Sequence, residues 1–167
     1  HGPAAFLVLD CGEDKPDSCA EYGYTICFHD FRLEESEFIK SVIANADKEY
    51  NAPGVKHRLI ISHVAFSHVC QHPFDIEQDT YSEWARLLRE EIKPDLMLCG
   101  HEHKTYVSYP GDIQDALGHP CTVLIGSDVN YEGEYYTGMG VTVNEGGAKV
   151  VFNTNHEILE TLDVLYK

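Results

Sequence analysis

The segment from Arg58 to Gly100 constrains the fold of this chain more than any other. It begins with the apolar run RLIISHV and ends with the apolar run DLMLCG, and a helix-like stretch, TYSEWARLL, lies between them. Thr80 and Glu83 match a capping box that would start this helix, and Pro94 would stop it. A strand, a helix and a second strand in this order predict a crossover connection between two parallel strands.

Further elements extend this unit on both sides. The run AAFLVLD, residues 4–10, predicts a buried strand, and apolar residues at helical spacing from Leu33 to Tyr50 predict a helix that Pro53-Gly54 ends. After residue 100, short β-prone segments are separated by turn-forming residues, and VTVNEGGAKVVF is the clearest hairpin. The sequence therefore predicts one α/β domain over residues 1–167, with a β-rich hairpin region after residue 100.

The charge of the chain bears on its partners. It has 28 Asp and Glu against 12 Lys and Arg, a formal net charge of −16. This balance disfavours nucleic acid and anionic membrane surfaces as partners, and an anionic substrate would need local positive charge such as metal ions. No apolar run approaches the roughly 20 residues that a spanning helix needs. The six cysteines are scattered without a CxxC pair, which favours reduced thiols and a reducing compartment such as the cytoplasm.

Three histidines follow the ends of the two predicted parallel strands. His63 comes after LIIS, and His101 and His103 come after LMLCG. Ligands of open α/β sheets bind at the carboxyl ends of strands, where these imidazoles would meet. Two histidines at i and i+2 in extended backbone would project to the same side, and neutral imidazole binds Zn, Fe and Mn. We expect a metal site at His63, His101 and His103; the alternative is that His101 and His103 are only polar residues leaving a strand.

Two of these motifs resemble those of calcineurin-like metallophosphoesterases. IISHV, residues 60–64, looks like the strand-end histidine motif of that family, and CGHEHK, residues 99–104, looks like its GHxH motif. FLVLDCGEDKPD, residues 6–17, is similar to the strand and loop that precede them in a bacterial branch of the family. The resemblance implies the C-terminal half of a two-sheet sandwich flanked by helices, an αββα fold.

The resemblance also implies an activity. The parent enzyme would hydrolyse phosphomonoesters or phosphodiesters with a dinuclear centre of divalent metals, from among Mn, Fe, Zn and Ni. His63 and His101 would bind one metal and His103 the other, and the metals would polarise the ester and activate a bridging water.

The remaining ligands of the family come from DxH, GDxxD and GNH[DE] motifs, and the chain contains no DxH. GDIQD, residues 111–115, and NHE, residues 155–157, match parts of the other two, but both follow GHEH whereas the family places them before it. We interpret them as turn and hairpin-end residues. We therefore expect an N-terminally incomplete domain that binds metal weakly, is inactive or weakly active alone, and self-associates through exposed sheet surface.

The competing hypothesis is a noncatalytic domain that binds a partner or ligand and keeps the fold with an incomplete metal site. Other side chains near the motifs are weaker candidates. His68 and His72 could reach a substrate from the loop after His63, but histidines in a polar loop are more often exposed or bonded locally, so we leave them out of the site. Asp128 could orient a ligand histidine or serve a turn.

Overall fold

The computed structural model describes residues 2–12, 15, 17–68, 77–129 and 136–167 of the chain. His72 and the side chain of Asp128 lie outside this described part. The helices and strands follow one another along the chain in the order β1 (Ala4–Leu9), η1 (Ala20–Tyr22), α1 (Phe28–Ala44), β2 (His57–Ser62), α2 (Gln78–Leu87), η2 (Leu88–Ile92), β3 (Leu96–Cys99), β4 (Lys104–Ser108), β5 (Thr122–Val129), β6 (Tyr136–Asn144), β7 (Gly147–Thr154) and β8 (Ile158–Leu165).

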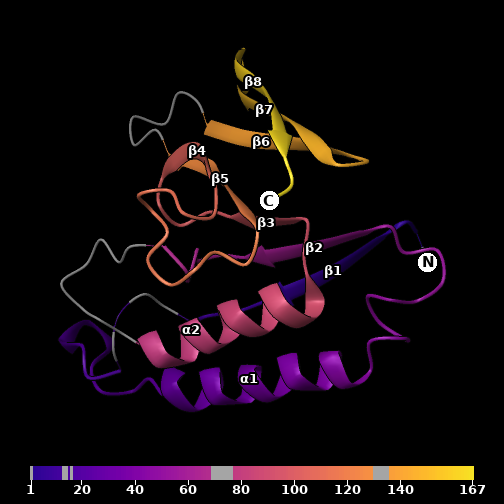
Figure 1. The fold of residues 1–167 in the computed structure, drawn as a ribbon. Coiled ribbons are helices and arrows are strands. Elements are labelled where there is room, and N and C mark those ends of the chain that lie inside the picture. Colours follow the sequence, from indigo (N-terminus) through magenta and orange to yellow (C-terminus); the bar gives the residue numbers. More distant parts are fainter. Residues whose placement is uncertain (1, 13–14, 16, 69–76, 130–135) are drawn as a thin grey trace.

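The strands form a sheet with a mixed part and an antiparallel part. Their order is β1-β2-β3-β5-β6-β7-β8, and β4 pairs with β5 off this path. β1, β2, β3 and β5 are parallel to one another, whereas β4 is antiparallel to β5 and β6, β7 and β8 are antiparallel throughout. α1 and α2 lie side by side along β1 and β2, and β6 to β8 lie on the other side of the molecule (Figure 1). The fold class is α/β, as the sequence predicts.

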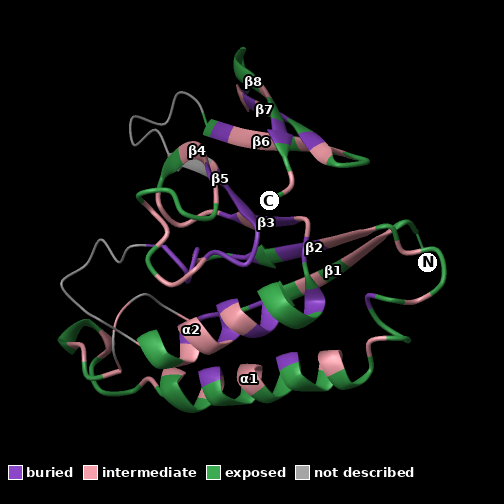
Figure 2. Ribbon diagram, in the orientation of Figure 1, coloured by how far each residue is buried: buried purple, intermediate pink, exposed green. Residues whose placement is uncertain are grey.

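Two apolar cores lie on the two faces of the parallel strands. Neighbouring residues of a strand point to opposite faces, so Ile60 packs in the core that contains Trp84 and Leu59 packs in the core that contains Phe152. The first core joins the strands to α1 and α2, and the second joins them to β7 and β8. Figure 2 shows the same division on the helices, whose buried residues face the strands and whose exposed residues face outward.

The crossover unit and the hairpin are confirmed. β2 and β3 are parallel with α2 between them in the chain, and β6 pairs with β7 through the turn from Asn144 to Gly147. β8 is a strand that sequence analysis missed. Its leucines at 159, 162 and 165 have helix-like spacing, and Glu160 and Asp163 interrupt its apolar pattern. It is extended because it pairs with β7 over most of its length.

Both helix starts differ from the predicted ones. α1 begins at Phe28, well before Leu33, because the Asp17 carboxylate accepts hydrogen bonds from the backbone N–H groups of Phe28 and His29, each at 3.1 Å. These are two of the amide groups that a helix start leaves without an internal partner. α1 also ends at Ala44 rather than near Tyr50.

The predicted capping box of α2 is wrong. The helix begins at Gln78, so that Thr80 and Glu83 both lie inside it. Glu77 precedes the first turn with a left-handed φ of 49°, and its carboxylate accepts a hydrogen bond from the Thr80 hydroxyl at 3.2 Å. Glu83 pairs instead with Arg86 at 2.9 Å on the surface of the helix.

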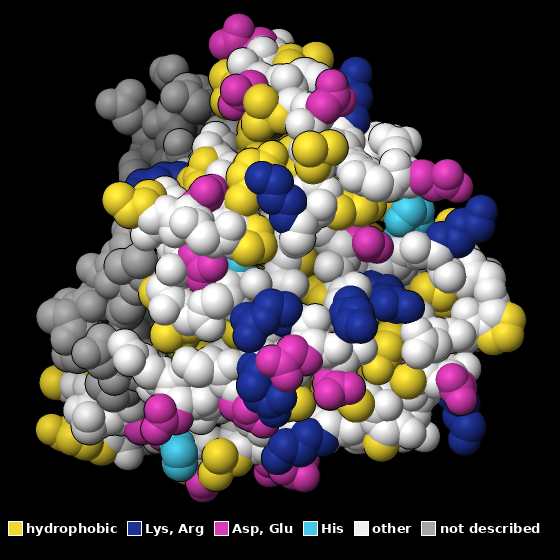
Figure 3. Space-filling model, in the orientation of Figure 1, with side chains coloured by type: hydrophobic (Ala, Val, Ile, Leu, Met, Phe, Trp, Pro, Cys, Tyr) yellow, Lys and Arg dark blue, Asp and Glu magenta, His cyan; other side chains and the backbone are white. Residues whose placement is uncertain are grey.

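Opposite charges are interspersed on the outer faces of the two helices (Figure 3). Arg86 pairs with Glu83 and Glu90, and Lys40 pairs with Glu37, at 2.7–2.9 Å. Exposed pairs of this kind each contribute well under about 1 kcal/mol, so they balance charge locally more than they stabilise the fold. No helix in the described part of the chain is long and apolar enough to cross a membrane.

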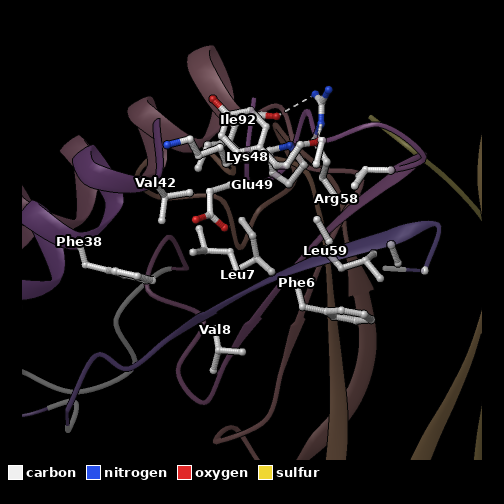
Figure 4. A pocket seen from close by; sticks show the side chains of 18 residues that line it. Phe6, Leu7, Val8, Phe38, Val42, Lys48, Glu49, Arg58, Leu59 and Ile92 are labelled. Carbon is white, nitrogen blue, oxygen red and sulfur yellow. Dashed lines mark hydrogen bonds between the residues drawn. The ribbon is translucent and has the colours of Figure 1, made fainter. Parts of the chain in front are cut away.

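The outer edge of β1 carries exposed apolar side chains. β1 is at one end of the strand order, and Phe6 and Val8 are 57% and 60% exposed. A pocket of about 470 Å³ lies along this strand (Figure 4). Phe38 and Val42 of α1 line it with apolar surface, and Lys48 and Glu49 lie beside them. An apolar edge strand without charged side chains is an easy template for strand pairing between molecules.

We therefore expect the chain to self-associate through β1. Sedimentation velocity should show a sedimentation coefficient that rises with protein concentration, and Val8→Glu should abolish this rise because it places a charge on the exposed apolar surface. Ile113→Glu is the matched control, since Ile113 is 88% exposed and lies in the loop between β4 and β5. A wild-type chain that sediments as a monomer at every concentration contradicts the prediction.

Candidate metal centre

The ends of β2 and β3 bring His63 and His101 together. The two strands are parallel, His63 is the first residue after β2, and His101 follows β3 after Gly100 alone. The Gly100 N–H donates a hydrogen bond to the His63 carbonyl oxygen at 3.1 Å, which joins the two loops directly. His63 Nε2 then lies 3.2 Å from His101 Nδ1. Two of the three predicted histidines thus meet at the predicted edge of the sheet.

The spacing of this pair suits a metal ion. Two imidazole nitrogens bound to one tetrahedral ion at about 2.0–2.1 Å lie about 3.3 Å from each other. The observed 3.2 Å matches the spacing of two imidazole ligands of one ion. Without an ion, one ring can donate a hydrogen bond to the other. His63 is exposed and His101 is half-buried, so the pair is open to solvent and to a ligand.

The described residues offer no third ligand beside the pair. Among the described residues, no three His, Cys, Asp or Glu side chains are arranged to hold a metal ion. His103 is exposed and does not complete such a group with His63 and His101. Asp10, which follows β1 at the same edge, accepts a hydrogen bond from the Gly12 N–H at 2.8 Å. The described residues therefore fit two ligands of one metal rather than a complete centre.

The backbone around GHEH is not extended, and this corrects the sequence analysis. His101 has a φ of 64° and His103 a φ of 51°, both in the left-handed region that side chains other than glycine rarely adopt. The Glu102 N–H donates to the Gly100 carbonyl at 2.7 Å and closes a tight turn around His101. The two histidines are presented by two left-handed turns, one on each side of Glu102.

The sequence matches no protein-family model, and no curated protein matches it significantly.

A buried network of polar side chains lies behind the histidine pair. His68 is 9% exposed rather than solvated, and its Nδ1–H donates to the Glu102 carboxylate at 2.6 Å. The Tyr106 hydroxyl donates to the other oxygen of the same carboxylate. Burial disfavours the charged carboxylate, but the hydrogen bonds from His68 and Tyr106 outweigh it and lower the pKa of Glu102 below its ordinary value. The sequence does not reveal this network, because nothing in the spacing of its members marks them as neighbours.

His119 extends the network and is held neutral. Its Nδ1 is 2.8 Å from the Ser67 hydroxyl and its Nε2 is 3.0 Å from the Ser108 hydroxyl, so both ring nitrogens have partners in the neutral form. Burial lowers the pKa of His119 to about 4, although the Asp115 carboxylate nearby favours the charged form. The ring also lies beside that of His68, with 4.8 Å between the centroids.

The neutral state of His119 predicts a dependence of stability on pH. The unfolded chain takes up a proton near the ordinary pKa of 6.5, whereas the folded chain does so only near 4, so the free energy of unfolding should fall as the pH drops between these values. The shift corresponds to a loss of roughly 3 kcal/mol. Urea unfolding over this pH range measures it. His119→Gln keeps polar contacts for both serines but cannot titrate, so the slope should flatten; equal slopes in the two proteins contradict the prediction.

The GDIQD and NHE segments are turn residues, as interpreted from the sequence. The Asp112 carboxylate accepts from the Tyr109 N–H at 2.7 Å, and the Asp115 carboxylate accepts from the N–H groups of Gly111, Gly118 and His119 at 2.8 Å. NHE links β7 to β8, where the Thr154 hydroxyl oxygen accepts from the N–H groups of residues 156 and 157. The two carboxylates and the Thr154 hydroxyl therefore stabilise turns.

Proposed function

We propose that this chain is part of a metal-dependent phosphoesterase of the calcineurin-like type. In this proposal His63 and His101 bind one divalent metal ion and His103 contributes to a second. The observation that carries it is the 3.2 Å between His63 Nε2 and His101 Nδ1 at the carboxyl ends of two parallel strands. The order of the motifs along the chain, a strand-end histidine, a helix and then GHxH, supports the same assignment.

The arrangement of the layers also supports the proposal. α1 and α2 cover one face of the parallel strands, and β7 and β8 contribute to the core on the other face. This is compatible with the C-terminal half of a sandwich of two sheets with helices outside. The proposed missing half would supply the remaining ligands and the second helical layer.

The chemistry of the site would be hydrolysis of a phosphomonoester or phosphodiester. Bound divalent metals, from among Mn, Fe, Zn and Ni, would polarise the ester and lower the pKa of a bound water. His63 and His101 would supply imidazole nitrogen ligands at a solvent-open edge. The chain has a net charge of −16, so in this proposal the metal ions also provide the positive charge that an anionic substrate needs.

The alternative is a noncatalytic domain that binds a partner or ligand. The observation that favours it is the lack of a third ligand around His63 and His101 among the described residues. The two hypotheses differ in their requirement for metal, since only the phosphoesterase needs the histidine pair to bind an ion.

The test combines metal titration with an assay of phosphate-ester hydrolysis. Calorimetry with Mn²⁺, Zn²⁺ and Ni²⁺ should show weak binding by the 167-residue chain, and a generic aryl phosphate with added Mn²⁺ should not be hydrolysed. Robust hydrolysis that is lost in His101→Ala would overturn the incomplete site and confirm a complete enzyme. No binding of any of these ions at millimolar concentration would favour the noncatalytic alternative.

A further inference from the structure

We propose that Glu102 is the positioning residue of the GHEH loop, and that its buried carboxylate holds His101 and His103 in the conformation that presents them to metal. This inference rests on the proposed function, because it concerns the same histidines. Glu102 lies between them in the chain, yet its side chain is only 11% exposed, whereas His103 on the next position is exposed. The Glu102 carboxylate therefore points into the protein, although the loop itself lies at the edge of the sheet.

The carboxylate is anchored from two directions. His68, in the segment that follows β2, donates to one oxygen at 2.6 Å, and Tyr106 on β4 donates to the other. Tyr106 is itself held in register opposite Ile125 of β5, and His68 is bridged to Asp115 in the loop between β4 and β5. One anchor therefore lies on a strand of the sheet, and the other is joined to the loop that connects β4 and β5.

This anchor explains the unusual backbone of the loop. Left-handed conformations at residues other than glycine persist only where surrounding contacts impose them. His101 and His103 both have such conformations, and Glu102 between them makes two side-chain hydrogen bonds, one to His68 in the segment after β2 and one to Tyr106 on β4. Charge-assisted hydrogen bonds of a buried carboxylate are among the strongest that a side chain makes. The carboxylate can thus maintain both turns and keep His101 near His63.

The anchor also connects the two loops that carry the candidate ligands. His68 is five residues after His63, so the bond from His68 to Glu102 runs from the loop of one ligand to the loop of the other. The Gly100 N–H to His63 carbonyl bond makes a second connection between the same loops. Together they set the separation of the two rings before any metal binds. Such preorganisation by groups behind the ligands typically changes metal affinity by about 10–100-fold.

The experiment compares Glu102→Ala and Glu102→Gln with wild type and with Glu160→Gln, a matched control at an exposed position on β8. Co²⁺ is the probe, and its visible absorption reports both affinity and the geometry of its ligands. We expect Glu102→Ala to weaken Co²⁺ binding by about 10-fold or more and to change the spectrum. Glu102→Gln, which keeps the shape and one acceptor oxygen, should restore part of the affinity, and Glu160→Gln should match wild type. Glu102→Gln also serves where the alanine variant does not fold.

A second readout does not depend on metal. In the metal-free protein, the imidazole ¹⁵N and ¹H signals of His101 and His103 should shift in Glu102→Ala, while those of His156, far along the chain on the turn between β7 and β8, should not. A purely structural role would lower the melting temperature without altering these signals or the Co²⁺ spectrum. Unchanged signals of His101 and His103 in a folded Glu102 variant overturn the inference.

The two proposals can fail separately. If His63→Ala and His101→Ala abolish Co²⁺ binding while Glu102→Ala binds like wild type, the positioning role is wrong and the proposed metal site stands. If wild type binds no Co²⁺, the proposed function fails, and the metal-free signals of His101 and His103 still decide whether Glu102 holds the loop.

Discussion

His101→Ala should bind Co²⁺ at least about 100-fold more weakly than the wild-type chain. Loss of a group that only orients a metal ligand already costs about 10–100-fold in affinity, and His101 would be a ligand itself. Among the described residues two imidazoles meet at this site, so removal of one leaves a single histidine, which differs little from any exposed histidine on the surface. His63→Ala should have the same effect, because the two rings act on one ion.

The matched control is His156→Ala. This histidine is exposed on the turn between β7 and β8, and β5 and β6 separate β7 from β3 in the strand order, so its loss should leave Co²⁺ affinity unchanged. Calorimetry and the visible spectrum of Co²⁺ measure all three variants under the same conditions. Equal weakening by His156→Ala would mean that the chain binds Co²⁺ only through scattered surface histidines. His63 and His101 would then not form a specific metal site.

Trp84→Ala should lower the free energy of unfolding by about 3–5 kcal/mol. Trp84 is fully buried in the core between the helices and the sheet, and its indole N–H donates to the Ser36 hydroxyl of α1 at 2.7 Å. The ring also packs edge to face with Phe66 and Tyr81, with centroids 5.5 and 5.4 Å away. Its removal leaves a cavity where α1, α2 and the sheet meet. A loss of this size is a large part of the roughly 5–15 kcal/mol that stabilises a typical domain.

Two further variants separate packing from hydrogen bonding at this position. Trp84→Phe keeps most of the aromatic packing but lacks the indole N–H, so its loss should be smaller, about 1–2 kcal/mol. Ile113→Ala changes a residue that is 88% exposed and should alter stability by less than about 0.5 kcal/mol. Thermal and urea unfolding measure the series. A Trp84→Ala protein as stable as Ile113→Ala would show that the helices are not held to the sheet through this residue.

Much of the candidate site could be predicted from local patterns. The six-residue strand β2 ends just before His63 and the four-residue strand β3 ends shortly before His101, and the parallel crossover places both strand ends at one edge. The approach of these two histidines follows from that topology alone. The backbone conformation of GHEH did not follow, because left-handed φ values are uncommon at residues other than glycine and the i, i+2 spacing of the histidines favours extended backbone.

The network behind the pair could not be predicted for a related reason. Glu102 and His68 are 34 residues apart, and their bond depends on how the two loops pack against β4 and β5. His68 looks like an exposed loop histidine in the sequence, yet burial and the Glu102 carboxylate make it part of the interior. Such contacts depend on the whole fold rather than on any short segment.

The sequence by itself determined the α/β class, the parallel crossover and the three histidines at the strand ends, because apolar runs and turn residues act over a few neighbouring positions. Only the tertiary structure decided where α1 starts, that β8 is a strand, and how the GHEH loop is held. In each case the deciding contact comes from elsewhere in the chain: the Asp17 carboxylate for α1, the pairing with β7 for β8, and His68 with Tyr106 for Glu102.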